Sequence, residues 1–121
     1  MKEGYVILTP LPQTDGRVKN RPALLLREFP PYGDFLVCGL STQLRQFIPN
    51  LDDLISRADA DFSASGLIEG SVIRLGFLAI LPRNKIVGVI GAVSSERHAR
   101  LLERLASYLT ESIEKPIAGR S

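Results

Sequence analysis

The segment Ala23-Leu-Leu-Leu-Arg-Glu-Phe-Pro-Pro-Tyr-Gly-Asp-Phe-Leu-Val-Cys-Gly-Leu-Ser41 contains two apolar runs separated by a short turn. The first run, residues 23–28, stops at a pair of prolines, which cannot donate a hydrogen bond to a sheet. The second run, residues 35–41, is apolar up to its last residue, as expected of a strand buried on both faces. Two such strands joined by a turn at residues 31–34 predict an antiparallel hairpin.

Further β segments flank this hairpin in the sequence. The first, residues 5–9, is β-branched and apolar, and we expect it to end at Pro10 and Pro12. A polar loop at residues 13–20 follows and contains the turn pair Asp15-Gly16. Later strands are predicted at residues 71–75, 77–81 and 86–92.

The region between residues 50 and 66 is predicted to be a short helix followed by a loop. Asn50 can cap a helix over residues 50–58, whose apolar side chains share one face. Small and polar residues then predict a loop over residues 59–66.

The last element is an amphipathic helix. Ser94 or Ser95 can cap its N-terminus, and it continues for about five turns to end before Pro116. The apolar stripe that we expect to face the sheet consists of Leu101, Leu102, Leu105, Tyr108 and Leu109. The opposite face is predicted to be solvent-exposed, with an ion pair between Glu96 and Arg100. A contact with RNA or with a partner is the alternative for its arginines, Arg97, Arg100 and Arg104.

Length and composition favour a single globular domain. The chain has 121 residues, of which 45% are hydrophobic, so a core can form without disulfides. Short strands combined with one short and one long helix predict an α+β domain built on a curled sheet or small barrel. We expect this domain to span residues 1–114, followed by a short tail, residues 115–121.

Charge and cysteine content limit the setting in which the protein works. The net charge of +2 is too small for a protein that coats nucleic acid by bulk electrostatics. Cys38 is the only cysteine, which excludes an intramolecular disulfide and fits a reducing cytoplasm. The longest apolar run, residues 86–93, is less than half a membrane span, and no signal peptide is recognised. We therefore expect a cytoplasmic protein without a membrane segment.

Common catalytic and metal-binding patterns are absent from the sequence. One histidine and one cysteine cannot build a zinc site, and there is no phosphate-binding loop, so neither metal nor cofactor is expected. His98 is interpreted as a surface helix residue rather than as an acid or base. The remaining feature is a basic run without an acid, Arg17, Lys19, Arg21 and Arg27. These side chains can bind phosphate or form a plain solvated loop, and composition alone leaves both open.

The order of several motifs resembles one protein family. The motifs are Gly4–Pro12, Asn20–Leu26 with its Arg-Pro-Ala-Leu opening, Leu36–Gln43, Gly66–Leu75 with its Ser-Val pair, and Ile86–Ser94 before the helix. In this order they resemble the MazF/PemK family of toxins from type II toxin-antitoxin systems. The resemblance covers about residues 4–110.

The resemblance implies a homodimeric SH3-like barrel that is neutralised by a small antitoxin. It also implies a metal-independent endoribonuclease that cleaves single-stranded RNA at a short sequence. The 2'-hydroxyl of the RNA attacks the adjacent phosphate and leaves a 2',3'-cyclic phosphate and a 5'-hydroxyl. Such an enzyme needs no nucleophile of its own, only stabilisation of phosphoryl charge and movement of protons.

Matching the motifs residue by residue gives candidate site residues. The family's catalytic arginine before proline falls on Arg21, and its catalytic threonine at the end of the third strand falls on Ser41. If the match to the family motif is shifted by one residue, the role of the catalytic threonine falls on Thr42. The candidates for RNA contact are Arg17, Lys19, Asn20 and Gln43. The alternative is that the strand-end hydroxyls only hydrogen-bond the backbone.

The sequence departs from the family pattern at two places. The Glu-Gln pair that commonly precedes the Arg-Pro is missing, so the general base is unassigned. The family's acidic-Gln-Ile-Arg-Thr stretch is replaced by residues 76–80, in which Phe77 and Ala79 stand for the glutamine and the arginine. Two other functions therefore remain open: a non-enzymatic, CcdB-like toxin that binds a protein target, and a decayed module of the same fold.

Overall fold

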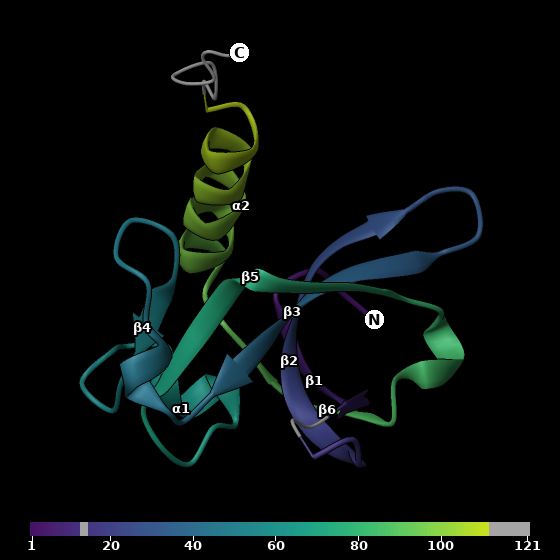
Figure 1. Cartoon of the computed structure of the whole chain (residues 1–121), viewed down its shortest axis with the longest axis horizontal. Coiled ribbons are helices and arrows are strands. Elements are labelled where there is room, and N and C mark those ends of the chain that lie inside the picture. Colours follow the sequence, from purple (N-terminus) through teal and green to yellow (C-terminus); the bar gives the residue numbers. More distant parts are fainter. Residues whose placement is uncertain (13–14, 112–121) are drawn as a thin grey trace.

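Six antiparallel strands and two helices make up residues 1–12 and 15–111, the part of the chain that the computed structural model describes (Figure 1). The strands are β1 (Tyr5–Pro12), β2 (Val18–Phe29), β3 (Asp34–Ser41), β4 (Asp53–Ile55), β5 (Ser71–Leu81) and β6 (Gly88–Ala92). The helices are α1 (Phe62–Ser65) and α2 (Ser95–Leu109), with 3₁₀ turns η1 (Leu44–Gln46) and η2 (Arg83–Lys85). The strands form one sheet in the order β4-β5-β3-β2-β1-β6, which confirms the α+β class.

The hairpin of β2 and β3 is confirmed. Leu24 pairs with Cys38 and Leu25 with Val37 in an antiparallel register. On its other side β3 pairs with β5, so β3 is an interior strand with neighbours on both edges. Cys38 is fully buried, and burial raises the pKa of its thiol to about 12.

Prolines are tolerated inside β1 and β2 because each stands where its own strand pairs with only one neighbour. Pro10 and Pro12 follow Leu8, the last residue of β1 that pairs with β6. Pro22 precedes Ala23, where the pairing of β2 with β3 begins. Proline has no N–H group and cannot donate a hydrogen bond to a second neighbouring strand. Sheets therefore tolerate it where the strand has only one neighbour. The prediction that prolines end the first strand is therefore wrong.

Apolar side chains cover both faces of the sheet. Along β2, Leu24 and Leu26 belong to one cluster and Ala23 and Leu25 to another, following the two-residue repeat of a strand. The larger cluster, core 1, comprises Val6, Leu24, Leu26, Cys38, Ile55, Phe62, Ile73, Leu75, Leu101 and Leu105. The smaller cluster, core 2, comprises Ile7, Ala23, Leu25, Phe35 and Val37.

Helix α1 bridges the two edges of the curled sheet. It follows the edge strand β4 in the chain and packs against β6, the strand at the opposite edge. Two glycines allow this close approach. A Cβ on Gly91 would overlap the carbonyl oxygen of Ala64, and a Cβ on Gly66 would overlap that of Ile90. The sheet is thereby curled into the small barrel that the sequence predicted.

Helix α2 is capped as predicted and covers core 1 with its first half. Ser94 Oγ accepts a hydrogen bond of 3.1 Å from Arg97 N, and Leu101 and Leu105 are buried. Tyr108 and Leu109, however, are 55% and 69% exposed, so the buried stripe is shorter than predicted. The C-terminal half projects away from the sheet (Figure 1).

The helix spans 15 residues, about four turns rather than five. The predicted helix end before Pro116 and the predicted tail, residues 115–121, lie outside the described residues. No helix within the described ranges is both long enough and apolar enough to cross a bilayer.

The predicted helix over residues 50–58 is wrong, because Asp52 holds the backbone in a turn. Its side chain accepts hydrogen bonds from Ile48 N (2.9 Å) and from Leu75 N (3.0 Å) in β5. Such side chain to backbone bonds compete with a helical path. Asn50 has a φ of 69°, so it does not act as a helix cap, and the chain continues into β4.

Two other boundaries also differ from the sequence prediction. The segment predicted as a loop at residues 59–66 contains α1. The two strands predicted at residues 71–75 and 77–81 are one strand, β5, with a shift of register between Cys38 and Gly39 of β3. The shift absorbs the extra residues around Gly76 without ending the strand.

The charged face of α2 binds the segment around β4 and α1 instead of facing solvent. Arg97, whose side chain is 7% exposed, pairs with Asp53 (2.9 Å) and Asp61 (2.8 Å). We call this group the arginine–aspartate cluster; it consists of Arg97, Arg100, Arg104, Asp53, Asp59 and Asp61. The hydrogen bond from Arg97 lowers the pKa of Asp61 to about 2. The predicted pair of Glu96 with Arg100 is wrong, since Arg100 binds Asp53 at 2.9 Å.

Candidate functional site

Arg21 lies where β2 enters the wider part of the sheet. It is exposed, pairs with Thr9 of β1 and directly precedes Pro22. Ala23, two residues further on, is the first residue of β2 that pairs with β3. Because side chains alternate along a strand, Arg21 lies on the same face as Ala23 and Leu25, the face of core 2.

Ser41 is the last residue of β3 and lies on the same face as Arg21. It stands two residues beyond Gly39, the partner of Ala23, so the register continued past the last pair places Ser41 opposite Arg21. Ser41 Oγ accepts a hydrogen bond of 3.0 Å from Gln43 N. This bond uses a lone pair and leaves the hydroxyl hydrogen for another acceptor. Bonding to the backbone and donation to a substrate are thus compatible at this position.

The other predicted RNA contacts lie at the exposed ends of the same two strands. Lys19 and Asn20 are exposed residues at the start of β2. Thr42 and Gln43 are exposed and directly follow β3. In the sequence these four residues directly adjoin Arg21 and Ser41, and their side chains are open to solvent.

The basic run between residues 16 and 27 does not form a single surface. Arg17 pairs with Asp15 in the loop, with 3.1 Å between Nε and Oδ2. Arg27 lies toward the other end of β2 and pairs with Glu3 at 3.0 Å. The positive charge expected from the sequence is therefore partly neutralised by acids that flank the run or lie far from it in the chain.

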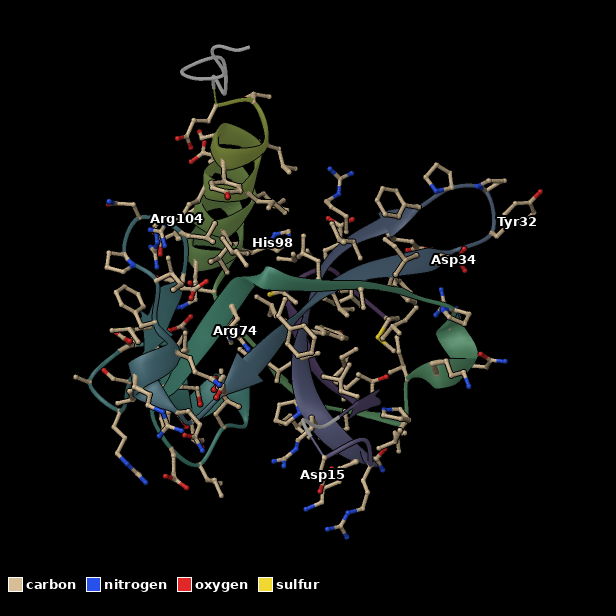
Figure 2. The ribbon with its side chains drawn as sticks, in the orientation of Figure 1. Asp15, Tyr32, Asp34, Arg74, His98 and Arg104 are labelled. Carbon is tan, nitrogen blue, oxygen red and sulfur yellow. The ribbon has the colours of Figure 1, made fainter. Side chains whose placement is uncertain are left out.

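The sequence interpretation missed one arginine on this face. Arg74, in the middle of β5, pairs across the sheet with Gly39 of β3. Its guanidinium carbon lies 5.5 Å from the centre of the Phe77 ring. In Figure 2, Arg74 lies near the centre of the molecule, where β5 and β3 run side by side. A single charge within the apolar run Val72-Ile-Arg-Leu75 was the signal that could have drawn attention to it.

His98 and Cys38 lie away from this group. A ring nitrogen of His98, Nε2, lies 2.8 Å from the carbonyl oxygen of Leu26, where α2 meets the far part of β2 (Figure 2). His98 is therefore partly buried at a helix–strand contact, not fully on the surface as predicted. Within residues 1–12 and 15–111, no group of histidine, cysteine, aspartate and glutamate side chains is arranged to hold a metal ion.

A model of the PemK-like, MazF-like toxins of type II toxin-antitoxin systems matches residues 2–109. The chain belongs to this toxin family. Two solved structures share its fold. Mycobacterium tuberculosis toxin MazF-mt6 has a TM-score of 0.63 and 18% identity, covering 87% of this chain and 95% of its own. An endoribonuclease in complex with its cognate antitoxin, from a mycobacterial species, has a TM-score of 0.65 and 16% identity, covering 93% and 97%. No curated protein matches the sequence.

The structure of this MazF-like toxin explains what replaces the polar stretch of the resembled family. Ala79 pairs with Val37 and packs against core 2. The Phe77 ring occupies the space above Gly39, where a Cβ would lie 2.5 Å from ring atom Cδ2. Both positions are thus committed to packing. Arg74 brings a guanidinium to the same strand, three residues before Phe77.

Proposed function

We propose that this chain is the toxin of a toxin-antitoxin pair and that it cleaves single-stranded RNA. Members of the family to which it belongs are endoribonucleases. The observation that supports the proposal is that Arg21 and Ser41 share one face of two neighbouring strands, Arg21 just before the first pair of β2 with β3 and Ser41 at the end of β3. Together they can present a planar cation and a hydroxyl donor to one phosphodiester.

The proposed reaction needs no covalent bond between protein and RNA. The 2'-oxygen of the RNA forms a bond to phosphorus while the bond from phosphorus to the 5'-oxygen breaks. The products are a 2',3'-cyclic phosphate and a 5'-hydroxyl, so one proton leaves the 2'-hydroxyl and one reaches the 5'-oxygen. Arg21 would bind the charge that develops on the phosphoryl oxygens, and Ser41 would donate a hydrogen bond to them. The general base is not assigned to a residue.

Cleavage of a mixed-sequence RNA by the purified full chain in EDTA tests this function. We expect fragments with 5'-hydroxyl ends, which a polynucleotide kinase labels without prior phosphatase treatment. Arg21→Ala is expected to reduce the rate by at least about a hundredfold, because a preorganised charge donor is lost. Arg27→Ala is the matched control, since Arg27 lies in the same strand but binds Glu3. Intact RNA at high enzyme concentration, or equal rates in the two variants, would contradict the proposal.

A second candidate function is supported by the apolar replacements in β5. Phe77 and Ala79 remove two polar side chains from the stretch where the resembled family carries them. This observation favours a toxin that binds a protein target, as CcdB-like toxins do, without cutting RNA. Growth arrest of expressing cells with intact cellular RNA would support this candidate. Growth arrest with cleaved mRNA would support the endoribonuclease and place its action in the cytoplasm.

We also propose that the chain acts as a homodimer. Leu78 and Ile80 in β5 are 38% and 55% exposed. They pair with Cys38 and Leu36, which places them on the face of core 1, beyond the part that α2 covers. Exposed apolar side chains on one sheet face suit a self-complementary contact between two copies.

Light scattering during gel filtration tests the dimer. The wild-type chain is expected to elute as a dimer, and the double variant Leu78→Glu/Ile80→Glu as a folded monomer. Val18→Glu is the control and should remain dimeric. It places a charge at the first residue of β2, where the native side chain is 63% exposed. A monomeric wild type would contradict this part of the proposal.

The expected partner is a small antitoxin. One of the structural neighbours was solved with its cognate antitoxin, and we extend this to the present chain. A short open reading frame beside the gene is the candidate. Co-expression should yield a complex in which RNA cleavage is suppressed, and failure of every neighbouring product to bind would contradict this extension.

A further inference from the structure

Arg74 shares a sheet face with Arg21 and Ser41. Its partner Gly39 is also the partner of Ala23, so Ala23, Gly39 and Arg74 form one row across three strands. Arg21 and Ser41 stand two residues beyond Ala23 and Gly39 in the same two strands, so the two-residue repeat puts them on the same face. With about 4.8 Å between strands, the Cα atoms of Ala23 and Arg74 are separated by roughly 10 Å, and Arg21 lies two residues, about 7 Å, before Ala23 in β2. Two arginine side chains that start this far apart can reach the same phosphodiester or two consecutive ones.

The guanidinium of Arg74 is held in place by a packed aromatic ring. Gly39 has no side chain, and the ring of Phe77 takes the space above it. Arg74 in turn lies over this ring, 5.5 Å from its centre, and is partly buried. A cation stacked on a fixed ring loses less freedom on binding an anion than a cation on a mobile loop.

Arg74 also differs from most arginines of the chain in its charge environment. Six arginines form ion pairs with carboxylates: Arg17, Arg27, Arg83, Arg97, Arg100 and Arg104. Among residues 1–12 and 15–111, no carboxylate forms such a pair with Arg74. A partly buried guanidinium without a carboxylate is suited to bind an anion from outside the chain.

We propose that Arg74 binds a backbone phosphate of the RNA next to the phosphate that Arg21 contacts, with Phe77 and Gly39 holding its guanidinium in position. This inference rests on the proposed ribonuclease function and deepens it. It adds a second phosphate contact and assigns a role to the apolar stretch of β5. Phe77 touches no substrate in this proposal and acts through Arg74 as a positioning residue.

Binding of a non-cleavable RNA separates this role from catalysis. The probe is a fluorescein-labelled 12-nucleotide pool of random sequence in which every 2'-hydroxyl is methylated, so that no nucleophile is present. Fluorescence anisotropy with the full chain gives Kd at several salt concentrations. We expect Arg74→Gln to raise Kd about tenfold at low salt and to reduce the slope of log Kd against log salt by about 0.7, the value for one phosphate contact on a single strand. Arg74→Lys is expected to keep the slope.

Matched variants control for charge and for folding. Arg83→Gln removes an arginine of η2, just beyond the end of β5, that also lies over a phenylalanine ring, Phe35, at 5.0 Å, and it should leave both Kd and slope unchanged. Phe77→Leu keeps the charge and loosens its support, so it should raise Kd less than Arg74→Gln does and add nothing in the Arg74→Gln background. Circular dichroism melting curves confirm that each variant is folded.

The outcomes distinguish this inference from the function on which it rests. If the wild type binds and cleaves RNA while Arg74→Gln binds with the same Kd and slope, the role of Arg74 is refuted and the ribonuclease proposal stands. An equal rise of Kd in Arg83→Gln would also refute it, because the effect would then come from the overall positive charge of the chain and not from a contact made by Arg74. If the wild type neither binds nor cleaves RNA, both proposals fail together.

Discussion

The arginine–aspartate cluster and the strand-end site of Arg21 and Ser41 use the same type of side chain under different conditions. In the cluster, Arg97 is almost fully buried and is surrounded by carboxylates from a segment more than 30 residues away in the chain. On the face of Arg21 and Ser41, Arg74 lies over the Phe77 ring and forms no ion pair with a carboxylate of the described residues. The first arrangement can stabilise the fold, and the second can bind an external anion. Variants of the cluster should therefore change stability, and variants of the site should change RNA binding and cleavage.

The largest loss of stability is expected from Arg97→Met. The substitution leaves Asp61, which is 10% exposed, without the cation that compensates it, while Asp53, which is 15% exposed, keeps Arg100 and Arg104. Removing one partner of a buried ion pair costs about 3 kcal/mol of unfolding free energy. Urea unfolding followed by circular dichroism measures this loss.

The control for this prediction is Arg100→Met in the same helix. Arg100 also binds Asp53 but is 47% exposed, so its replacement should cost less than about 1 kcal/mol. Equal urea midpoints for Arg97→Met and the wild type would show that the cluster does not stabilise the fold. Cleavage per folded molecule should be unchanged in both variants, which separates the cluster from the site.

Lowering the pH should weaken the ion pairs of the arginine–aspartate cluster before it weakens packing in the two apolar cores. The pKa of Asp61 is about 2 in the folded chain against an ordinary value of 3.8, because Arg97 binds its charged form. A lowered pKa contributes stability above pH 4, and this contribution is lost as the pH falls from about 4 to 2. The contribution is about 2 kcal/mol.

Asp61→Asn should remove this part of the pH dependence, so its unfolding free energy should approach that of the wild type at pH 2. Parallel pH curves for the two proteins would contradict the assignment.

Elements determined by local patterns were predictable from the sequence. The hairpin of β2 and β3 follows from two apolar runs around a turn, and the cap at Ser94 follows from its place before an amphipathic pattern. The position of Ser41 at the end of β3 also followed from the sequence, whereas Arg21 lies inside β2, which begins at Val18, before the strand predicted at residues 23–28. In each case the residues that decide the structure are neighbours in the chain.

Features that depend on distant residues were not predictable. Residues 50–58 have a helical pattern, but Asp52 binds Leu75 N, 23 residues away. The arginines of α2 have a pattern typical of an exposed face, yet their partners lie on another segment. The place of Arg74 was not predictable because the register that puts it opposite Gly39 is set by the pairing of β5 with β3, including the shift between Cys38 and Gly39.

The smallest effect that we predict separates Ser41 from its neighbour Thr42 as the hydroxyl donor. Alternation along β3 places Ser41, its last residue, on the face of Gly39 and Arg21, whereas Thr42 lies in the bend beyond the strand. Ser41→Ala should therefore lower kcat about tenfold, equivalent to about 1.4 kcal/mol, while Thr42→Ala should leave it unchanged.

Ser41→Ala also loses the bond from Gln43 N, so Ser41→Thr, which keeps a hydroxyl, is needed to separate the two effects. We expect Ser41→Thr to retain activity, because the resembled family carries threonine at the end of this strand. If Thr42→Ala loses activity and Ser41→Ala does not, the register is shifted by one residue and Thr42 is the donor. If neither variant changes kcat, the hydroxyls serve only the backbone turn, and the stabilisation of phosphoryl charge rests on the arginines.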